Sequence, residues 1–176
     1  AIYCVIMTAV AMLGFIPIMM PMLCVLVPLI GGTPMMLFMT KVNKFGMITI
    51  YSMIVGLFLW ITGMGYWPFI FGIVFGFLAD LIAKSGSYKS SKKAILSCGV
   101  FNILIFGNFV PLLINAEAYF ETRQSFGEDY INSLSEIMSQ TWLAPLLIAA
   151  CFVFGVVGAL IGKALLKKHF VKAGIA

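Results

Sequence analysis

The amino-acid sequence predicts an all-α membrane protein: a single integral domain over residues 1–176, with six transmembrane helices and both termini in the cytoplasm. Hydrophobic residues make up 62% of the chain and charged residues only 10%, whereas a soluble domain carries about 25% charged residues. The few charges also stand in short clusters that separate long charge-free stretches. So little charge cannot cover a soluble surface, and so many apolar residues exclude an intrinsically disordered chain.

The charge-free stretches define the expected helices. No charged side chain occurs in residues 1–40, 45–79, 94–116 and 137–162. A helix needs about 20 apolar residues to cross a bilayer, so the first two stretches are long enough for two spans each and the others for one each. The expected spans are residues 1–16, 18–39, 46–62, 67–83, 94–114 and 142–166, with an outer loop over 115–141.

Prolines and glycines divide the two long stretches. Pro17 and Pro21 bracket a turn in the first stretch, and Gly63, Gly65 and Pro68 mark a turn in the second. Proline fixes φ and supplies no backbone donor, and glycine permits tight turns. Short loops are therefore expected near these residues.

Two spans depart from a regular apolar helix. Span 1 would rise only about 24 Å against a hydrocarbon core of about 30 Å, so we expect its first turns to precede residue 1. Span 2 contains Pro28 and the run Gly-Gly-Thr-Pro at 31–34. A simple proline kink and a functional break in the helix both fit this pattern.

The lysines predict the orientation. With six spans, all the lysines fall on one side of the membrane, and Arg123 stands alone on the other. An excess of lysine and arginine marks cytoplasmic loops, and the net charge of +5 then indicates contact with anionic lipid rather than nucleic acid. The lysines are Lys41, Lys44, Lys84, Lys89, Lys92, Lys93, Lys163, Lys167, Lys168 and Lys172.

The outer loop over 115–141 is acidic and partly amphipathic. Five of the six acids lie in it: Glu117, Glu121, Glu128, Asp129 and Glu136. Apolar residues recur at helical spacing, which predicts a short amphipathic helix on the outer surface. These residues are Ile131, Leu134, Ile137 and Met138.

The sequence indicates no enzyme, no cofactor and no metal centre. The motifs HExxH, GxSxG and the P-loop pattern do not occur, and His169 is the single histidine. Four cysteines lie within predicted spans without CxxC spacing, as apolar fillers do: Cys4, Cys24, Cys98 and Cys151. Asp80 stands four residues before Lys84, which favours an ion pair over a proton relay.

Polar and aromatic residues at the outer level of the spans are the candidate ligand contacts. Asn108 and Asn115 are seven residues apart, so a regular helix would place them on one face. They fit helix–helix adhesion and ligand binding equally well. Tyr66, Trp67 and Trp142 cluster at the same level, either as an interfacial aromatic belt or as a stacking pocket.

Small residues at four-residue spacing predict close helix contacts. Gly158-xxx-Gly162 in span 6 has this pattern, and Ala1 and Ala9 give span 1 small positions on roughly one side. The pattern suits internal packing and contact with a partner subunit alike.

Several segments resemble the Trep_Strep family of bacterial integral membrane proteins. They are the run Gly-Thr-Pro-Met-Met-Leu-Phe-Met-Thr-Lys-Val at 32–42, Lys-Phe-Gly-Met-Ile-Thr-Ile at 44–50, Leu-Ala-Asp-Leu-Ile at 78–82 and Gly-Ser-Tyr-Lys-Ser at 86–90. Together with Gly56-Leu57 and Gly63, the resemblance covers spans 2 to 5, about half of the chain. The Ala-Asp-Leu-Ile and Tyr-Lys-Ser elements in this order are the more specific part.

That family looks like the substrate-binding S components of energy-coupling factor importers in the bacterial plasma membrane. The resemblance implies a transmembrane coupling subunit and two ATPases as partners. It implies as ligand a vitamin or precursor, such as hydroxymethylpyrimidine or a vitamin B6 vitamer, bound at the outer side. The substrate-binding residues would be Tyr66, Trp67, Asn108, Asn115, Glu117 and Trp142.

The resemblance also implies a docking surface on the coupling subunit. Its expected residues are Ala1, Ala9, Gly158 and Gly162. The helix 1 pattern departs from that of S components, because Val5 follows Ala1 and Leu13 follows Ala9 at the four-residue positions. The alternative function is an autonomous secondary transporter or channel for a small neutral solute, although no inverted repeat is found.

Overall fold

The computed structural model describes residues 2–121, 127–140 and 142–166, without the side chains at 117 and 118. Within these ranges the regular structure is helical, and no strand occurs. The four long helices are α2 (Met19–Met39), α3 (Met47–Leu59), α4 (Trp67–Ser85) and α9 (Leu143–Leu165). The shorter helical elements are α1 (Ile2–Ala11), η1 (Met12–Phe15), η2 (Trp60–Met64), α5 (Ser91–Asn102), η3 (Ile103–Asn108), α6 (Val110–Ile114), α7 (Ala116–Glu121) and α8 (Glu128–Met138).

Four helices are long and apolar enough to cross a membrane: α2, α3 with its extension η2, α4 and α9. The helical segment Ile2–Phe15 is apolar but shorter. The expected span over 94–114 is divided into α5, the 3₁₀ segment η3 and α6. Pro111 contributes to this division, because it stands in the first turn of α6 and cannot donate a backbone hydrogen bond.

The proline-rich span 2 is a continuous helix rather than a broken one. Helix α2 runs through Pro28 and Pro34 without interruption, and Pro21 lies in its first turn instead of in the preceding loop. A proline costs little in the first turn, where the missing N–H has no intrahelical partner. The glycines provide close contacts: a Cβ at Gly31 would lie 2.7 Å from the Tyr3 ring, and one at Gly32 would overlap the backbone of α9.

Helix α9 packs against α2 through the small residues that the sequence placed at a possible subunit interface. Gly158 and Gly162 are both buried. A Cβ at Gly158 would lie 2.6 Å from the Leu29 oxygen, and one at Gly162 would lie 2.8 Å from the Gly32 oxygen. These glycines are used for packing inside the chain, so a partner subunit would have to contact other residues.

Helices α3 and α4 approach closely by the same means. A Cβ at Gly72 would lie 2.8 Å from the Ser52 backbone oxygen, and one at Gly76 would overlap the Ser52 side chain. The Ser52 hydroxyl also lies 2.6 Å from the Gly72 carbonyl oxygen, to which it donates. Small residues therefore let two apolar helices form a polar contact at their interface.

Asp80 caps a neighbouring helix instead of pairing with Lys84. Its buried carboxylate accepts hydrogen bonds from the backbone N–H of Gly46 at 2.7 Å and of Thr49 at 3.3 Å, and from the Thr49 hydroxyl at 3.1 Å. The Lys84 ammonium lies 4.8 Å from the centre of the Phe45 ring. The expected ion pair is therefore wrong, because the N-terminus of α3 supplies the donors that this carboxylate needs.

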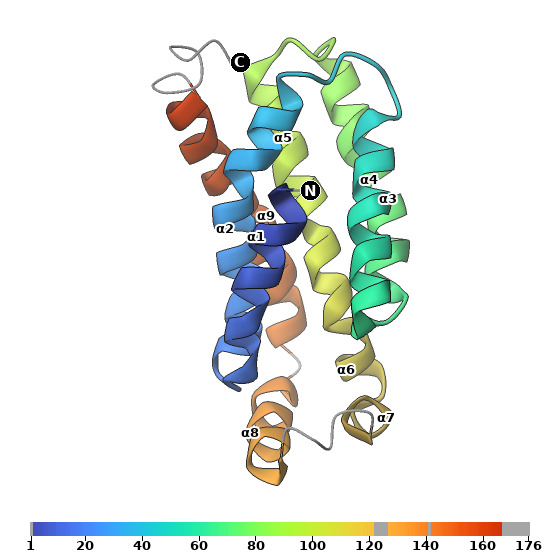
Figure 1. Cartoon of the computed structure of the whole chain (residues 1–176), viewed down its shortest axis with the longest axis vertical. Helices are drawn as coiled ribbons and strands as arrows, with labels where there is room; N and C mark the ends of the chain where they lie inside the picture. The colour runs from blue at the N-terminus through green and yellow to red at the C-terminus, as the bar shows by residue number, and fades with distance from the viewer. Residues whose placement is uncertain (1, 122–126, 141, 167–176) are drawn as a thin grey trace.

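The charged segments gather at opposite ends of the bundle (Figure 1). The α2–α3 and α4–α5 connections and the end of α9 lie at one end, and they carry the described lysines from Lys41 to Lys163. Helices α7 and α8 lie at the other end, with Glu121, Glu128, Asp129 and Glu136 in them. We refer to these as the lysine end and the acidic end.

Candidate functional site

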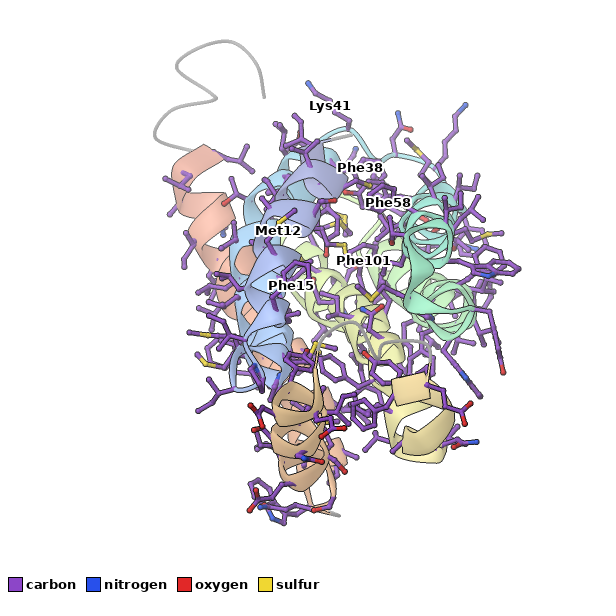
Figure 2. All side chains as sticks on the ribbon, turned by 60° about the horizontal axis from the view of Figure 1, so that its bottom comes forward. Met12, Phe15, Phe38, Lys41, Phe58 and Phe101 are labelled. Carbon is purple, nitrogen blue, oxygen red and sulfur yellow. The ribbon has the colours of Figure 1, made fainter. Side chains whose placement is uncertain are left out.

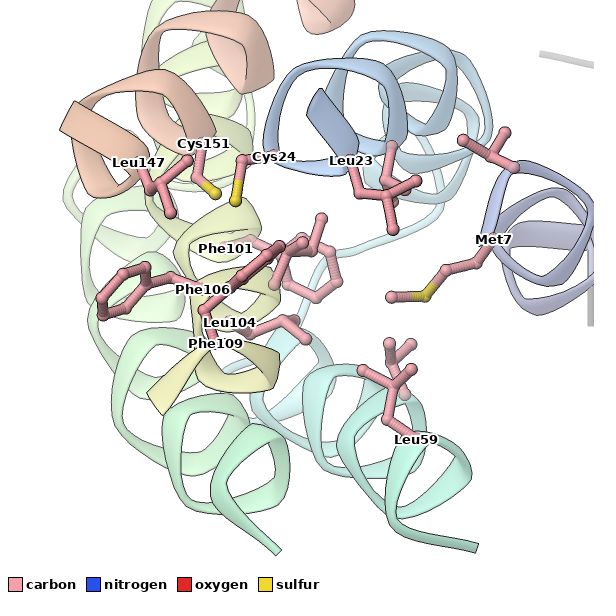
Figure 3. Close-up of a cluster of buried hydrophobic side chains, with 14 of the residues drawn as sticks. Met7, Leu23, Cys24, Leu59, Phe101, Leu104, Phe106, Phe109, Leu147 and Cys151 are labelled. Atoms are coloured by element: carbon pink, nitrogen blue, oxygen red, sulfur yellow. The ribbon is translucent and has the colours of Figure 1, made fainter. Parts of the chain in front are cut away.

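A cavity of about 230 Å³ lies towards the acidic end of the bundle. Its walls come from α1 with η1, the first half of α2, the end of α3 with η2, and η3, and one tyrosine from each of α7 and α8 also lines it. Met7, Leu23 and Leu59 point from three different helices towards this common space (Figure 3). Pockets for drug-sized ligands measure about 300–1,000 Å³, so this one suits a smaller molecule.

The walls are mostly aromatic and sulfur-containing. Phe15, Phe58 and Phe109 supply rings, and four methionines fill the remaining surface: Met7, Met12, Met20 and Met64. Met12 and Phe15 lie on the α1 side and Phe58 on the α3 side (Figure 2). Aromatic faces stack on planar ligands, and flexible thioether side chains adapt to irregular shapes.

Few polar groups line the cavity, and their hydrogens are largely engaged. The hydroxyl of Thr8 donates to the Cys4 carbonyl at 2.9 Å, and that of Thr62 donates to the Leu59 carbonyl at 2.9 Å. One hydrogen of the Asn108 amide nitrogen goes to the Ile105 carbonyl at 3.0 Å.

The amide oxygen of Asn108 is enclosed by protein and has no hydrogen-bond partner in the described part of the chain. Exchanging the amide oxygen and nitrogen would not help, because the oxygen would then face the Ile105 carbonyl, which is also an acceptor. An unsatisfied buried acceptor is unfavourable by about 1–3 kcal/mol. Since this side chain stands at the cavity wall, a bound molecule is one means of satisfying it.

Helix α8 lies at the acidic end of the cavity, which its Tyr130 lines. The Tyr130 hydroxyl donates to the Gly14 carbonyl of η1 at 2.7 Å, which ties α8 to the end of the first helix. Leu134 and Met138 are buried on the same helix, so the predicted amphipathic helix in this loop is confirmed. It packs on the protein's own core, and its acidic residues face away.

The residues expected to bind substrate are spread over a wider area than the cavity. Asn108 lines it, whereas Tyr66, Trp67, Asn115 and Trp142 do not. Tyr66 stacks on Trp67 with ring centres 5.3 Å apart, and Tyr66 and Trp142 are 51% and 60% exposed. An aromatic belt at the membrane interface fits the exposed pair, and their role in binding remains a prediction.

Asn115 does not share a helix face with Asn108. The 3₁₀ geometry of η3 and the restart of the helix at Val110 change the rotation between the two positions, and Asn115 ends α6 with an exposed side chain. The side chain of Glu117 lies outside the described residues. The asparagine that joins helices is Asn102, whose amide oxygen accepts from the Tyr3 hydroxyl at 3.1 Å.

Sequence reasoning missed the contributions of α1 and α3 to this site. Met7, Phe15 and Phe58 carry no signal that separates them from other apolar residues in a span. Thr8 and Thr62 are the exceptions, because a hydroxyl inside an apolar stretch could have drawn attention to both helices.

A groove on the outside of the bundle adjoins the cavity between α1 and α3. It shares Thr8, Met12 and Phe58 with the cavity and is otherwise lined by Cys4, Val5 and Ala9. Ala9 is exposed there, which leaves it accessible to lipid or to another protein. Ala1, the other small residue expected at a docking surface, lies outside the described residues.

Comparison with known proteins gives one match. Residues 1–172 match the family described as hypothetical bacterial integral membrane protein (Trep_Strep). No curated protein and no solved structure matches the chain. The apolar helices agree with a multi-pass membrane protein. Since the match covers nearly the whole sequence, this chain belongs to the Trep_Strep family of bacterial integral membrane proteins.

Proposed function

We propose that this chain is the substrate-binding subunit of an energy-coupling factor importer. The observation that carries the proposal is the cavity towards the acidic end, which is walled by α1, η1, α2, α3, η2 and η3 and is bordered by Tyr130 of α8. An apolar pocket of this size suits a protein that captures one small molecule and hands it over. The substrate is a vitamin or vitamin precursor.

The shortage of charged groups inside the bundle supports dependence on a partner. Asp80 is the one buried charged side chain among the described residues, and its carboxylate is occupied with capping α3 and with Tyr88. Ion-coupled transport usually relies on ionisable groups within the membrane. An external source of energy, a coupling subunit with two ATPases, is therefore part of the proposal.

In the proposed arrangement the chain crosses the plasma membrane six times, and its lysine end faces the cytoplasm. The segment Ile2–Phe15 and the composite helix from α5 to α6 would be the two additional crossings. The cavity then opens to the exterior, where a scarce nutrient would be captured. The exposed face of α1 around Ala9 is the docking surface that the packing of α9 leaves available.

Uptake assays test this proposal. Cells that express the chain with the coupling subunit and both ATPases should accumulate radiolabelled vitamins such as pyridoxine or hydroxymethylpyrimidine, and cells that lack the module should not. A Walker A lysine substitution in the ATPases is the matched control, and it should abolish accumulation. Accumulation that persists without the module would instead support an autonomous transporter.

A further inference from the structure

The lining of the cavity limits the chemistry of the molecule that it can hold. No charged side chain lines the cavity within the described part of the chain. An anion placed there would lose its hydration without gaining a counter-charge, which costs far more than burying a neutral polar group. A carboxylate or phosphate would therefore bind poorly.

The direction of the hydrogen bonds adds a second limit. The hydroxyl hydrogens of Thr8 and Thr62 both point to backbone carbonyls, so these two oxygens have only lone pairs left for a ligand. The amide oxygen of Asn108 is one more acceptor, and it lacks a partner. The cavity thus presents mainly acceptors, to which an N–H or O–H group of a ligand can donate.

The charges around the cavity also disfavour anions. Helices α7 and α8 at its acidic end carry Glu121, Glu128, Asp129 and Glu136, and no described residue of either helix is basic. Acidic groups at this end of the molecule lower the local concentration of anions near it. The electrostatic potential outside the cavity and the chemistry inside it disfavour the same class of molecule.

We infer that the cavity selects an uncharged ring compound bearing N–H or O–H donors and rejects its carboxylated or phosphorylated counterpart. This inference rests on the proposed function, because it takes the cavity to be the substrate site. The aromatic side chains would stack on the ring, and Asn108 would accept a hydrogen bond after a small local movement of its amide. A nutrient would then have to be taken up before it is phosphorylated.

Calorimetric titration of the purified chain in nanodiscs, without the module, tests the inference. The probes are matched pairs: pyridoxine and pyridoxine 5′-phosphate, nicotinamide and nicotinate, and hydroxymethylpyrimidine and its phosphate. We expect at least one neutral member to bind, and we expect its anion to bind at least about 100-fold more weakly. Equal or tighter binding of an anion, or no binding of any neutral member at about 1 mM, would overturn the inference.

Two lysine substitutions show whether the cavity causes the selectivity. Met12 lines the cavity and is 63% exposed, so Met12→Lys can add an ammonium there without burying it on folding. Met12→Lys should reduce the ratio of the affinity for the neutral compound to the affinity for its anion about tenfold. Met22→Lys is the matched control on α2, outside the lining, and it should leave the ratio unchanged. An equal effect of both would contradict a role for the cavity.

These results separate the two proposals. If the isolated chain binds selectively but uptake does not need the module, the proposed role as an importer subunit is overturned and the inferred selectivity stands. If uptake of a vitamin needs the module but the neutral and anionic members bind equally well, the inferred selectivity is overturned and the proposed function stands.

Discussion

Asp80 illustrates how one residue can join three segments of a membrane protein. One carboxylate oxygen accepts from Gly46 and Thr49 at the start of α3, and the other accepts from the Tyr88 hydroxyl at 2.9 Å. Helix α3 has no side-chain cap of its own, so this tertiary contact supplies the negative charge that a helix N-terminus favours. The segments at 44–50, 78–82 and 86–90, which carry the family resemblance, meet at this carboxylate.

The contact between Tyr88 and Asp80 predicts a pH-dependent stability. Burial, then the hydrogen bond to Asp80 and its charge, raise the pKa of Tyr88 from 10.0 to about 12. Because the folded state holds this proton more tightly, the contribution to stability is complete below about pH 10 and is lost as the pH rises towards about 12. Tyr88→Phe should lower the free energy of unfolding by about 1 kcal/mol at neutral pH.

Thermal unfolding of both proteins in detergent, followed across the alkaline range, measures this effect. The difference in stability between the wild type and Tyr88→Phe should shrink as the pH rises above about 10. Lysines titrate in the same range, but they are common to both proteins and cancel in the comparison. A gap that stays constant up to about pH 12 would show that the phenol proton does not stabilise the fold.

The sequence did not reveal which partner each residue contacts in the folded protein. The spacing of Asp80 and Lys84 permits an ion pair, but the N-terminus of α3 lies closer to the carboxylate and Phe45 attracts the ammonium. The assumption of one regular helix misplaced Asn115 relative to Asn108. For Asp80 the deciding contact comes from a segment far along the chain, and for the asparagines it is a local change of helix geometry that decides.

At the scale of elements, glycines let the long helices approach each other. Helix α9 lies against α2 at Gly158 and Gly162, and α4 lies against α3 at Gly72 and Gly76. Lipid provides no hydrophobic driving force between helices, so close packing and interhelical hydrogen bonds hold such pairs together. Around this frame, α1 with η1 and the 3₁₀ segment η3 complete the walls of the cavity.

Enlarging one of these glycines should separate its helix pair. Gly158→Ala puts a methyl group within 2.6 Å of the Leu29 oxygen, and we expect a loss of about 1–3 kcal/mol of stability. Ala149→Leu adds more volume on an exposed face of the same helix and should change stability by less than about 0.5 kcal/mol. Denaturation midpoints in detergent give both values, and equal effects would contradict the packing account.

The contact of α8 with η1 should control how fast a ligand leaves. Tyr130→Phe removes the hydrogen bond to the Gly14 carbonyl, which is worth about 1 kcal/mol and therefore about a fivefold increase in the dissociation rate. Ser139→Ala is the control, since the Ser139 hydroxyl bonds within its own chain turn, to the Glu136 carbonyl. Stopped-flow fluorescence measures both rates. An unchanged dissociation rate in Tyr130→Phe would show that the contact of α8 with η1 does not control how fast a ligand leaves.

Some elements could be predicted from sequence and others could not. Periodic apolar residues identified α8 correctly, because its four apolar positions share one face. Pro28 and Pro34 left a kink and a break in α2 equally open, and the structure shows one continuous helix that packs closely on its neighbours at Gly31 and Gly32. The opposite error arose over 94–114, where a charge-free stretch long enough for one span was taken as one regular helix, although it changes from α5 to η3.

For the whole molecule, charge distribution was the informative feature of the sequence. The described lysines lie at one end and the described acids of α7 and α8 lie at the other, as the count of charge-free stretches implied. Six crossings and cytoplasmic termini remain predictions, because four helices meet the length of a span. Of the cavity's lining, Asn108 was predicted from the sequence as a ligand contact but the other residues were not, since these are mostly apolar and scattered from α1 to α8.

The orientation can be tested with single cysteines. Asp129→Cys on α8 should react with a membrane-impermeant maleimide in intact cells, and Lys89→Cys should react only after permeabilisation. Three of the native cysteines are buried and one is partly buried, so the unmodified protein measures the background. Labelling of Lys89→Cys in intact cells would place the lysine end outside and contradict the proposed topology.

The most direct test of the central claim fills the cavity. Small molecules released from purified protein are identified by mass spectrometry for the wild type, for Ala11→Phe in the cavity wall and for Ala149→Phe on the exposed face of α9. We predict that the wild type and Ala149→Phe release the same small uncharged compound and that Ala11→Phe releases none. Full retention of that compound by Ala11→Phe would show that the ligand binds elsewhere and would contradict the account.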